Sequence, residues 1–345
     1  MTDPSGAPGP ANASNAFAVT WHGLEAIALE NAWLRVTMVP AMGGRIVELI
    51  DRAGERDLLW HNPRATPRPA PYGAHFDDWW SGGWDEIFPS GDAGRLHGEP
   101  LPYMGELWCV PWEASISRPP GGTVAIDAGA YGTIAAARFE RRLSLDVDAP
   151  VVRARYRIEN LDVRPLPFTW GIHPAFAVGP THRIDHPATM MEVGASSSDA
   201  LGRPGQTYEW PNLPEPDSPT GTRDLSLVRA RDAAVFGGHW AMDLRDGWLA
   251  LTDTATGRGV TIVFDRAIFP TAWLWQVYGG WRGHHHVALE PWTSRPMDLD
   301  GAIATGRERT LAPGEVLETE VAFVLHEGLD RVRGVERDAG RILVR

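Results

Sequence analysis

Two residues of this sequence stand in settings that suit proton transfer, His173 and Glu290. His173 lies in the segment FTWGIHPAF, among aromatic residues and before a proline that favours extended backbone. An imidazole in a partly apolar pocket titrates near neutrality, which suits a general acid or base. Glu290 ends the apolar run VALE directly before another proline, and could act as a general base. Each also has a structural interpretation, His173 as a satisfied core histidine and Glu290 as the ion-pair partner of an arginine.

The segment that carries Glu290 also allows a metal site. His284, His286 and Glu290 have the core spacing of a cupin metal motif, and the two histidines fall on one face of a strand. His326 could complete the ligand set. The glycines that flank such a motif are displaced, however, and no second motif surrounds His326. A metal-dependent enzyme is therefore an alternative, and histidines at a solvated strand end are the simpler interpretation.

A third candidate is the loop GGWDEIFPSGDAGRLHGEPLPYMGELWCVPW, which is dense in Trp, Gly and acidic residues. This composition is typical of the rim of a ligand site. Asp85, Glu86 and His97 are its polar candidates. The same carboxylates could instead cap a surface loop. Cys109, the one cysteine, lies in the apolar context LWCVPW, so we expect it to be packed core and no intramolecular disulfide to form.

The composition excludes several classes of function. All 32 basic residues among the 345 are arginine, so Schiff-base, pyridoxal-phosphate and P-loop chemistries, which need a lysine, are ruled out. The net charge of −12 without a basic cluster argues against a nucleic-acid partner. No apolar run is long enough to cross a membrane and no secretory signal opens the chain, so we expect a cytoplasmic protein. The 16 tryptophans could supply stacking faces for sugar rings.

Period-2 alternation dominates the chain and predicts an all-β fold. The clearest case is VVRARYRIEN, which follows RFERRLSLDVD across a turn and so predicts an antiparallel hairpin. We expect a disordered lead over residues 1–16 and one large antiparallel sandwich over residues 17–345. A long loop is expected from Pro204 to Arg223, and the tail from Gly328 onward offers the one possible helix.

Four stretches together resemble the aldose 1-epimerase (galactose mutarotase) family, over roughly residues 25 to 327. They are LRVTMVPAMGGRIVELID, GGWDEIFPS followed by GELWCVPW, FTWGIHPAF, and LEPWTS. The resemblance implies a β-supersandwich whose open cleft binds a free hexose. It also implies that His173 and Glu290 are the catalytic acid and base, which open the sugar ring at C1 and close it again. No metal or other cofactor is implied.

The resemblance extends to binding residues. Arg45 matches a position where arginine contacts sugar hydroxyls, and we expect Trp84, Asp85, His97 and Gln276 to line the cleft with it. Many relatives have a second sugar-binding histidine where this chain has Met104. Either His97, seven residues earlier, supplies that contact, or the contact is missing and the ligand differs.

The sequence thus predicts a mutarotase acting on a monosaccharide, as a monomer or homodimer. Its alternatives are a non-catalytic sugar-binding sandwich and the metal-dependent enzyme described above. An anionic sugar is conceivable because four arginines lie in or beside the motif segments: Arg45, Arg95, Arg282 and Arg295.

Overall fold

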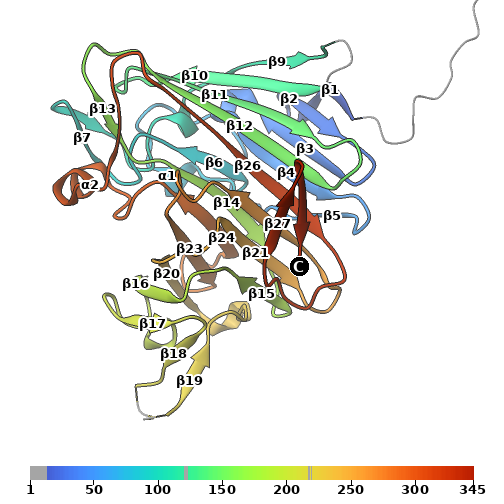
Figure 1. The fold of residues 1–345 in the computed structure, drawn as a ribbon, viewed down its shortest axis with the longest axis vertical. Coiled ribbons are helices and arrows are strands. Elements are labelled where there is room, and N and C mark those ends of the chain that lie inside the picture. Colours follow the sequence, from blue (N-terminus) through green and yellow to red (C-terminus); the bar gives the residue numbers. More distant parts are fainter. Residues whose placement is uncertain (1–13, 120–122, 217, 219) are drawn as a thin grey trace, which may run out of the picture.

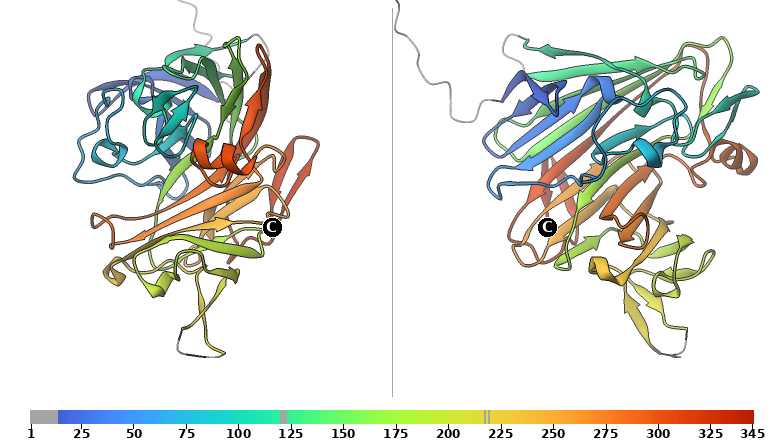
Figure 2. Two further views of the ribbon diagram at one scale, coloured as in Figure 1. Left: turned by 90° about the vertical axis from the view of Figure 1, so that its left-hand side faces the viewer. Right: turned by 180° about the vertical axis from the view of Figure 1, so that it is seen from behind.

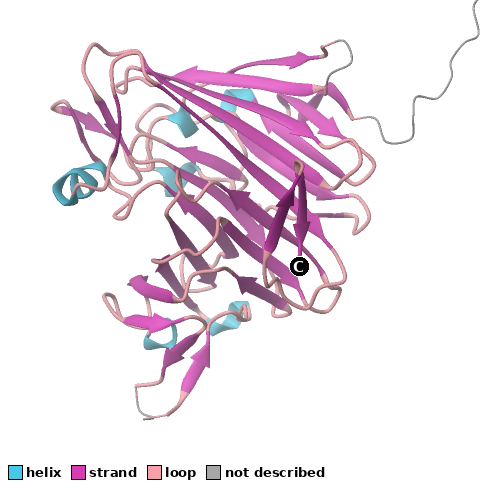
Figure 3. Ribbon diagram, in the orientation of Figure 1, coloured by secondary structure: helices cyan, strands magenta, loops and turns pink. Residues whose placement is uncertain are grey.

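The fold is all-β, as the alternation predicts. The structure, a computed structural model, describes residues 14–119, 123–216, 218 and 220–345. Strands make up most of the regular structure, and helices are few and short (Figure 3). The two α-helices of the described residues are α1 (Phe76–Trp79) and α2 (Leu299–Thr305). None of the helices in the described part of the chain is long and apolar enough to cross a membrane.

Two large antiparallel sheets pack face to face (Figure 1 and Figure 2). The larger has 14 strands, in the order β1-β2-β3-β4-β6-β14-β24-β23-β20-β16-β17-β18-β19, with β5 paired to β4. Its strands are β1 (Asn15–Trp21), β2 (Leu24–Glu30), β3 (Leu34–Val39), β4 (Arg45–Asp51), β5 (Arg56–Asp57), β6 (Trp84–Ile87), β14 (Gly171–Ala177), β16 (Met190–Ser196), β17 (Thr207–Glu209), β18 (Asn212–Pro214), β19 (Thr222–Asp224), β20 (Val235–Ala241), β23 (Thr271–Tyr278) and β24 (His285–Trp292).

The second sheet has eight strands, in the order β15-β21-β22-β26-β12-β11-β10-β9. They are β9 (Glu113–Ser117), β10 (Ala125–Tyr131), β11 (Ala137–Leu145), β12 (Val151–Asn160), β15 (His182–Asp185), β21 (Trp248–Asp253), β22 (Arg258–Phe264) and β26 (Val316–His326). Three two-stranded ribbons complete the fold: β7 (Gly94–Leu96) with β8 (Glu99–Leu101), β13 (Leu166–Phe168) with β25 (Arg309–Leu311), and β27 (Val335–Asp338) with β28 (Arg341–Val344).

The main hydrophobic core fills the space between the two large sheets. The predicted hairpin is confirmed as β11 and β12, and its alternation decides which side chains enter the core. Val152, Ala154, Tyr156 and Ile158 are buried, while the arginines between them are partly or fully exposed. Period-2 patterning thus places one face of the strand against the other sheet.

Two sequence expectations are wrong, and both fall on weakly patterned segments. The tail forms the hairpin β27–β28 rather than a helix, because Ala339 and Gly340 both have positive φ in its two-residue turn. Val335 and Ile342 of this hairpin pack on the outer apolar face of the eight-stranded sheet. The long loop expected from Pro204 to Arg223 instead contains the short strands β17, β18 and β19.

The lead expected over residues 1–16 falls mostly outside the described residues, which begin at position 14. Its last two residues, Asn15 and Ala16, belong to β1 and pair with β2.

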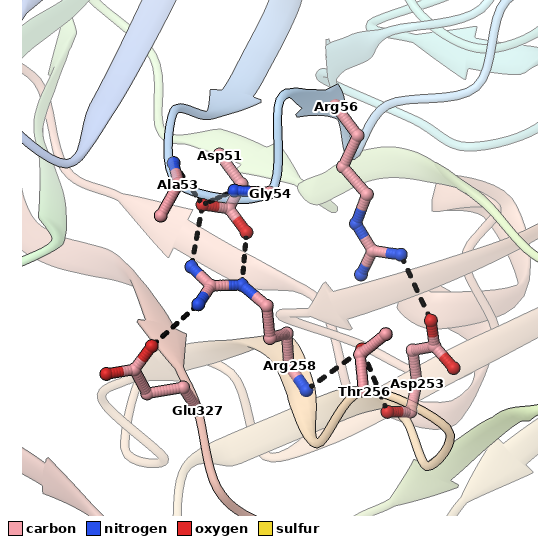
Figure 4. A network of polar contacts seen from close by, with 8 residues as sticks. All are labelled: Asp51, Ala53, Gly54, Arg56, Asp253, Thr256, Arg258 and Glu327. Atoms are coloured by element: carbon pink, nitrogen blue, oxygen red, sulfur yellow. Dashed lines mark hydrogen bonds and ion pairs between the residues drawn. The ribbon is translucent and has the colours of Figure 1, made fainter.

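A network of charged side chains ties the two sheets together at one end (Figure 4). Arg258, at the start of β22, makes two hydrogen bonds to the carboxylate of Asp51, at the end of β4, both 2.8 Å long. It also donates to Glu327. Beside it, Arg56 of β5 donates to Asp253 of β21. These side chains therefore join the turn after β4 to the β21–β22 turn.

We expect Arg258→Ala to lower the free energy of unfolding by about 2 kcal/mol, because the well-buried Asp51 carboxylate loses its forked partner. Arg258 holds the pKa of Asp51 below its usual value against the opposing effect of burial. This stabilisation is therefore present above the unfolded carboxyl pKa and is lost as the pH falls through the folded one. Urea unfolding at neutral pH and at pH 3 measures both effects.

The matched control is Arg164→Ala, since Arg164 pairs with Asp162 two residues away on the surface. That substitution should cost far less than Arg258→Ala, because water screens an ion pair on the surface. Equal losses in the two variants would show that the cross-sheet pair does not fasten the sheets.

Candidate active site

One row of side chains crosses the larger sheet where β6, β14, β24 and β23 lie side by side. Asp85 pairs with His173, and Glu290 pairs with Trp273. The pairs on either side of His173 and Glu290 put these two residues opposite each other on β14 and β24. Side chains paired across antiparallel strands point to the same face. Residues that are 117 positions apart in the sequence therefore become neighbours.

This row lies on the face of the sheet that points away from the second sheet. Along β14, Ile172 and Phe176 belong to the core between the sheets, so His173 points the other way. Along β24, Val287 and Leu289 point into that core, and Glu290 points out. Because of this alternation, the side chains on one face of each strand pack in the core, and those on the other face are available to form a site.

His173 and Glu290 are close and buried. Nε2 of His173 lies 3.6 Å from Oε1 of Glu290, and the residues are 4% and 2% exposed. The other carboxylate oxygen of Glu290 accepts a hydrogen bond of 3.1 Å from Nε1 of Trp292. The imidazole of His173 meets the rings of Phe76 and Trp80 edge to face. The geometry orients both groups and leaves one oxygen and one nitrogen facing each other.

Burial shifts the pKa values of this pair in opposite directions. It lowers the pKa of His173 to about 3 and raises the pKa of Glu290 well above its usual value. The positive charge of Arg45 adds to the lowering at His173. Burial therefore favours the uncharged form of each group, a neutral imidazole and a protonated carboxyl group.

Arg45 and Asp85 lie in the same row but bind each other. Nε of Arg45 donates to Oδ1 of Asp85 over 2.6 Å, and Nε1 of Trp80 donates to the other oxygen over 3.1 Å. Burial raises the pKa of Asp85, and the Arg45 guanidinium opposes that rise. Arg45 also donates to the hydroxyl of Ser81. Asp85 thus adjoins His173 in the sheet and Arg45 adjoins Asp85, yet their polar atoms are largely satisfied within the protein.

An aromatic cover closes the site from outside the sheet. Phe76 of α1 and Trp80, directly after it, pack on His173, and Trp60 packs on Trp80. Met104, where many relatives would have a histidine, is buried in the same apolar cluster. The cover leaves His173 and Glu290 almost without contact to solvent.

Three of the expected cleft residues lie elsewhere. Trp84 points into the core between the sheets and stacks on Phe323. Gln276 alternates with Trp273 and Trp275 on β23, so it points to that same core, where its Oε1 accepts from the hydroxyl of Tyr278. His97 is exposed at the tip of the β7–β8 hairpin, with a φ of +52°.

Of the histidines of the metal alternative, His284 and His286 lie side by side, with ring centroids 6.1 Å apart, but His326 does not join them. His326 lies in the other sheet, where its ring nitrogens bond to the hydroxyls of Thr252 and Thr261. His284 and His286 both pack against Trp60. The described ranges contain no group of three or more His, Cys, Asp or Glu side chains arranged to hold a metal ion.

The sequence reasoning missed the residues that shape the site around the pair. Phe76 and Trp80 come from the segment HFDDWW, whose pattern predicts no strand and whose helix has only four residues. The histidine run is not a solvated strand end, because His284 and His286 are both buried. Period-2 alternation also places His286 on the same strand face as Glu290. Outside that set, Trp273 and Trp275 share one face of β23, which the alternation in TAWLWQVY indicates.

Comparison with known proteins supports the fold. No family model matches the chain. A galactose mutarotase-like protein from Lactobacillus casei matches with a TM-score of 0.60 and 16% identity, covering 87% of this chain and all of that one. A galactose mutarotase-like protein from Clostridium acetobutylicum matches with a TM-score of 0.61 and 15% identity over 90% of this chain and 98% of the other. A candidate aldose 1-epimerase from Klebsiella pneumoniae matches with a TM-score of 0.66 and 14% identity, covering 88% of this chain and 80% of that one.

These likenesses confirm the expected supersandwich: the chain has a galactose mutarotase-like fold. At such low identities they show the fold alone. What the site does has to be argued from its own residues.

We expect Arg45→Met to lower the free energy of unfolding by about 3–5 kcal/mol, because Asp85 is left as a buried carboxylate without its cation. The loss should be larger at pH 8 than at pH 5, since Asp85 can take up a proton at the lower pH. Urea unfolding at both pH values measures this.

Arg35→Met is the control, because Arg35 lies 3.9 Å from Glu48 and both are partly exposed. It should cost less than about 1 kcal/mol. Adding Asp85→Asn to Arg45→Met should restore part of the loss, and no restoration would contradict the pairing argument.

Proposed function

We propose that the protein is an aldose 1-epimerase-type isomerase, which interconverts the α and β anomers of a free aldose by acid–base catalysis. The observation that carries the proposal is the contact of His173 with Glu290 at 3.6 Å on a buried face of the sheet. The galactose mutarotase-like fold supports it.

The reaction needs two proton transfers at neighbouring atoms. Ring opening removes the proton from the C1 hydroxyl and adds one to the ring oxygen, and both oxygens are bonded to C1. The two catalytic groups must therefore be close neighbours, as Nε2 of His173 and Oε1 of Glu290 are. Glu290 is the base toward the hydroxyl and His173 is the acid toward the ring oxygen. After rotation about C1–C2, the same groups act in reverse to close the ring.

One proton shared by the pair is enough for the whole cycle. Ring opening starts with Glu290 ionised and His173 protonated, and it leaves Glu290 protonated and His173 neutral. The second of these states is the one that burial favours in the closed site. It is also the state that ring closure needs, because the neutral imidazole then accepts the C5 hydroxyl proton. Hydroxyl groups of a bound sugar would make the ionised state less costly.

The aromatic cover fits this chemistry in two ways. A dry site strengthens the interactions of the pair with the reacting oxygens. The indoles of Trp60 and Trp80 and the ring of Phe76 can also contact the C–H faces of a sugar once the cover has moved. Binding of a sugar thus replaces contacts between cover and pair with contacts to the substrate.

We expect His173→Ala and Glu290→Gln each to lower kcat by at least about 10²-fold, since each removes one proton-transfer group. Polarimetry with freshly dissolved α-glucose and α-galactose, corrected for the buffer rate, measures the acceleration. Circular dichroism and thermal unfolding check that each variant is folded.

The matched controls are His22→Ala and Glu25→Gln, two exposed residues of the β1–β2 hairpin. They should keep the full rate. If the protein accelerated no aldose, the sugar-binding sandwich without catalysis would replace the mutarotase as the better account. If either site variant kept the full rate, the assignment of that residue would be refuted.

We expect the rate to stay level from pH 7.5 to pH 5.5, through the ordinary pKa of histidine. The lowered pKa of His173 and the raised pKa of Glu290 both widen the range in which the pair holds one proton. An alkaline decrease should follow when Glu290 loses its proton in the free enzyme. A decrease in kcat/KM centred near pH 6.5 would show that the imidazole is not buried as the structure has it.

A further inference from the structure

Beyond Glu290, the same face of the sheet carries a pair of parallel tryptophans. Trp273 pairs directly with Glu290, and Trp275 follows two residues later on the same face of β23. Their ring planes differ by 11° and their centroids are 6.5 Å apart. Unlike Phe76 and Trp80, they are not fully buried. We call these two indoles the tryptophan platform.

Two glycines make room for the Trp273 ring of the platform. A Cβ atom on Gly238 of β20 would lie 1.9 Å from the Trp273 ring, and one on Gly194 of β16 would lie 2.5 Å from it. Neither glycine has a positive φ, so neither is needed for its backbone conformation. Glycine is required there for space, because the indole rests directly against the neighbouring strands. The Trp273 ring is thus held against these strands on one side and stays partly exposed.

The row ends in a polar pair. Past Trp273 it continues to Trp240 of β20 and then to Glu192 of β16. Arg295, from the segment after β24, binds Glu192, and the two side chains are 22% and 25% exposed respectively. A planar guanidinium and a carboxylate are suited to bonding adjacent sugar hydroxyls.

The row is long enough for more than one sugar ring. Three strand spacings separate Glu290 from Glu192, which is roughly 14 Å at the usual distance between paired strands. Stacking on an indole face uses the C–H surface of a pyranose, and the polar pair lies where a second ring would offer its hydroxyls.

We propose that the tryptophan platform and the Glu192–Arg295 pair bind a second pyranose ring, so that the preferred substrate is the reducing end of a disaccharide or longer saccharide. This inference rests on the proposed function, because it needs C1 of the first ring at His173 and Glu290. The platform directly adjoins that pair in the sheet, which is why the two rings would belong to one molecule.

The test compares sugars of one and two rings. Mutarotation of maltose, cellobiose and lactose is measured beside that of glucose and galactose, by polarimetry on freshly dissolved single anomers. We expect kcat/KM for at least one disaccharide to exceed that for both monosaccharides by about tenfold. Trp275→Ala should remove this advantage and leave the monosaccharide values within about twofold of the original.

Trp33→Ala is the control, because Trp33 is a partly exposed tryptophan in the β2–β3 turn, on a different part of the molecule. It should leave both classes of sugar unaffected. Binding of the same sugars to His173→Ala protein, followed by calorimetry, gives a readout that does not depend on turnover.

The outcomes separate the two proposals. Equal kcat/KM for one-ring and two-ring sugars, or a disaccharide advantage that survives Trp275→Ala, would overturn the platform and leave the mutarotase intact. Disaccharide binding that weakens in Trp275→Ala protein without any mutarotation would support the platform and refute the catalytic assignment. If no sugar is bound or turned over, both proposals fail.

Discussion

The register of β14 between β6 and β24 is the constraint on which the rest of the site depends. It sets His173 opposite Asp85 on one side and Glu290 on the other. A slip by one residue would turn His173 into the core between the sheets and bring Ile172 to the outer face. Because the inner faces of these strands are packed against the second sheet, such a slip would also expose core side chains. Packing in the core therefore fixes the register of β14, and this register places His173 opposite Glu290.

Two adjacent carboxylates of β6 show how both faces of this strand are held. Asp85 points outward and binds Arg45, while Glu86 points inward and accepts hydrogen bonds from Arg141, Tyr156 and Trp170. Glu86 is thus a structural core residue that bonds β6 to the second sheet, rather than the rim residue its loop suggested. A guanidinium can make several hydrogen bonds in a plane, which a lysine ammonium does not. In this protein without lysine, arginine is therefore well suited to pairing with buried carboxylates such as Asp85 and Glu86.

The aromatic cover buries polar groups without giving them hydrogen-bond partners. Both ring nitrogens of His286, and Nδ1 of His173, have no hydrogen-bond partner in the part of the chain that the structure describes. Unpaired buried polar atoms are costly, so the closed site is held by the packing of Trp60, Phe76 and Trp80 against this cost. A ligand with hydroxyl groups could relieve the cost that the cover imposes. Under the proposed function, the hydroxyl groups of the sugar would supply partners for these atoms.

Local sequence patterns were sufficient to predict much of the fold. Together with the family resemblance, they also indicated the two catalytic candidates. Alternation in VVRARYRIEN predicted its hairpin and its core face, since a strand's period is set by its own backbone. The motif order pointed to His173 and Glu290, whose roles stay a proposal. Arg45 and Asp85 lie in the same row of side chains as His173, where they bind each other, and their role in sugar binding stays a prediction.

Only the tertiary structure could decide to which face of the sheet a side chain points and which distant residues touch each other. Trp84 and Gln276 belong to strands of the site, but the pairing of those strands turns them into the core. Phe76 and Trp80 cover His173 because a nonperiodic segment folds back over the sheet, which no local pattern encodes. Residue types and their spacing determined the strands and the chemistry available. Which side chains meet was decided by strand register, because register depends on burial of both faces at once.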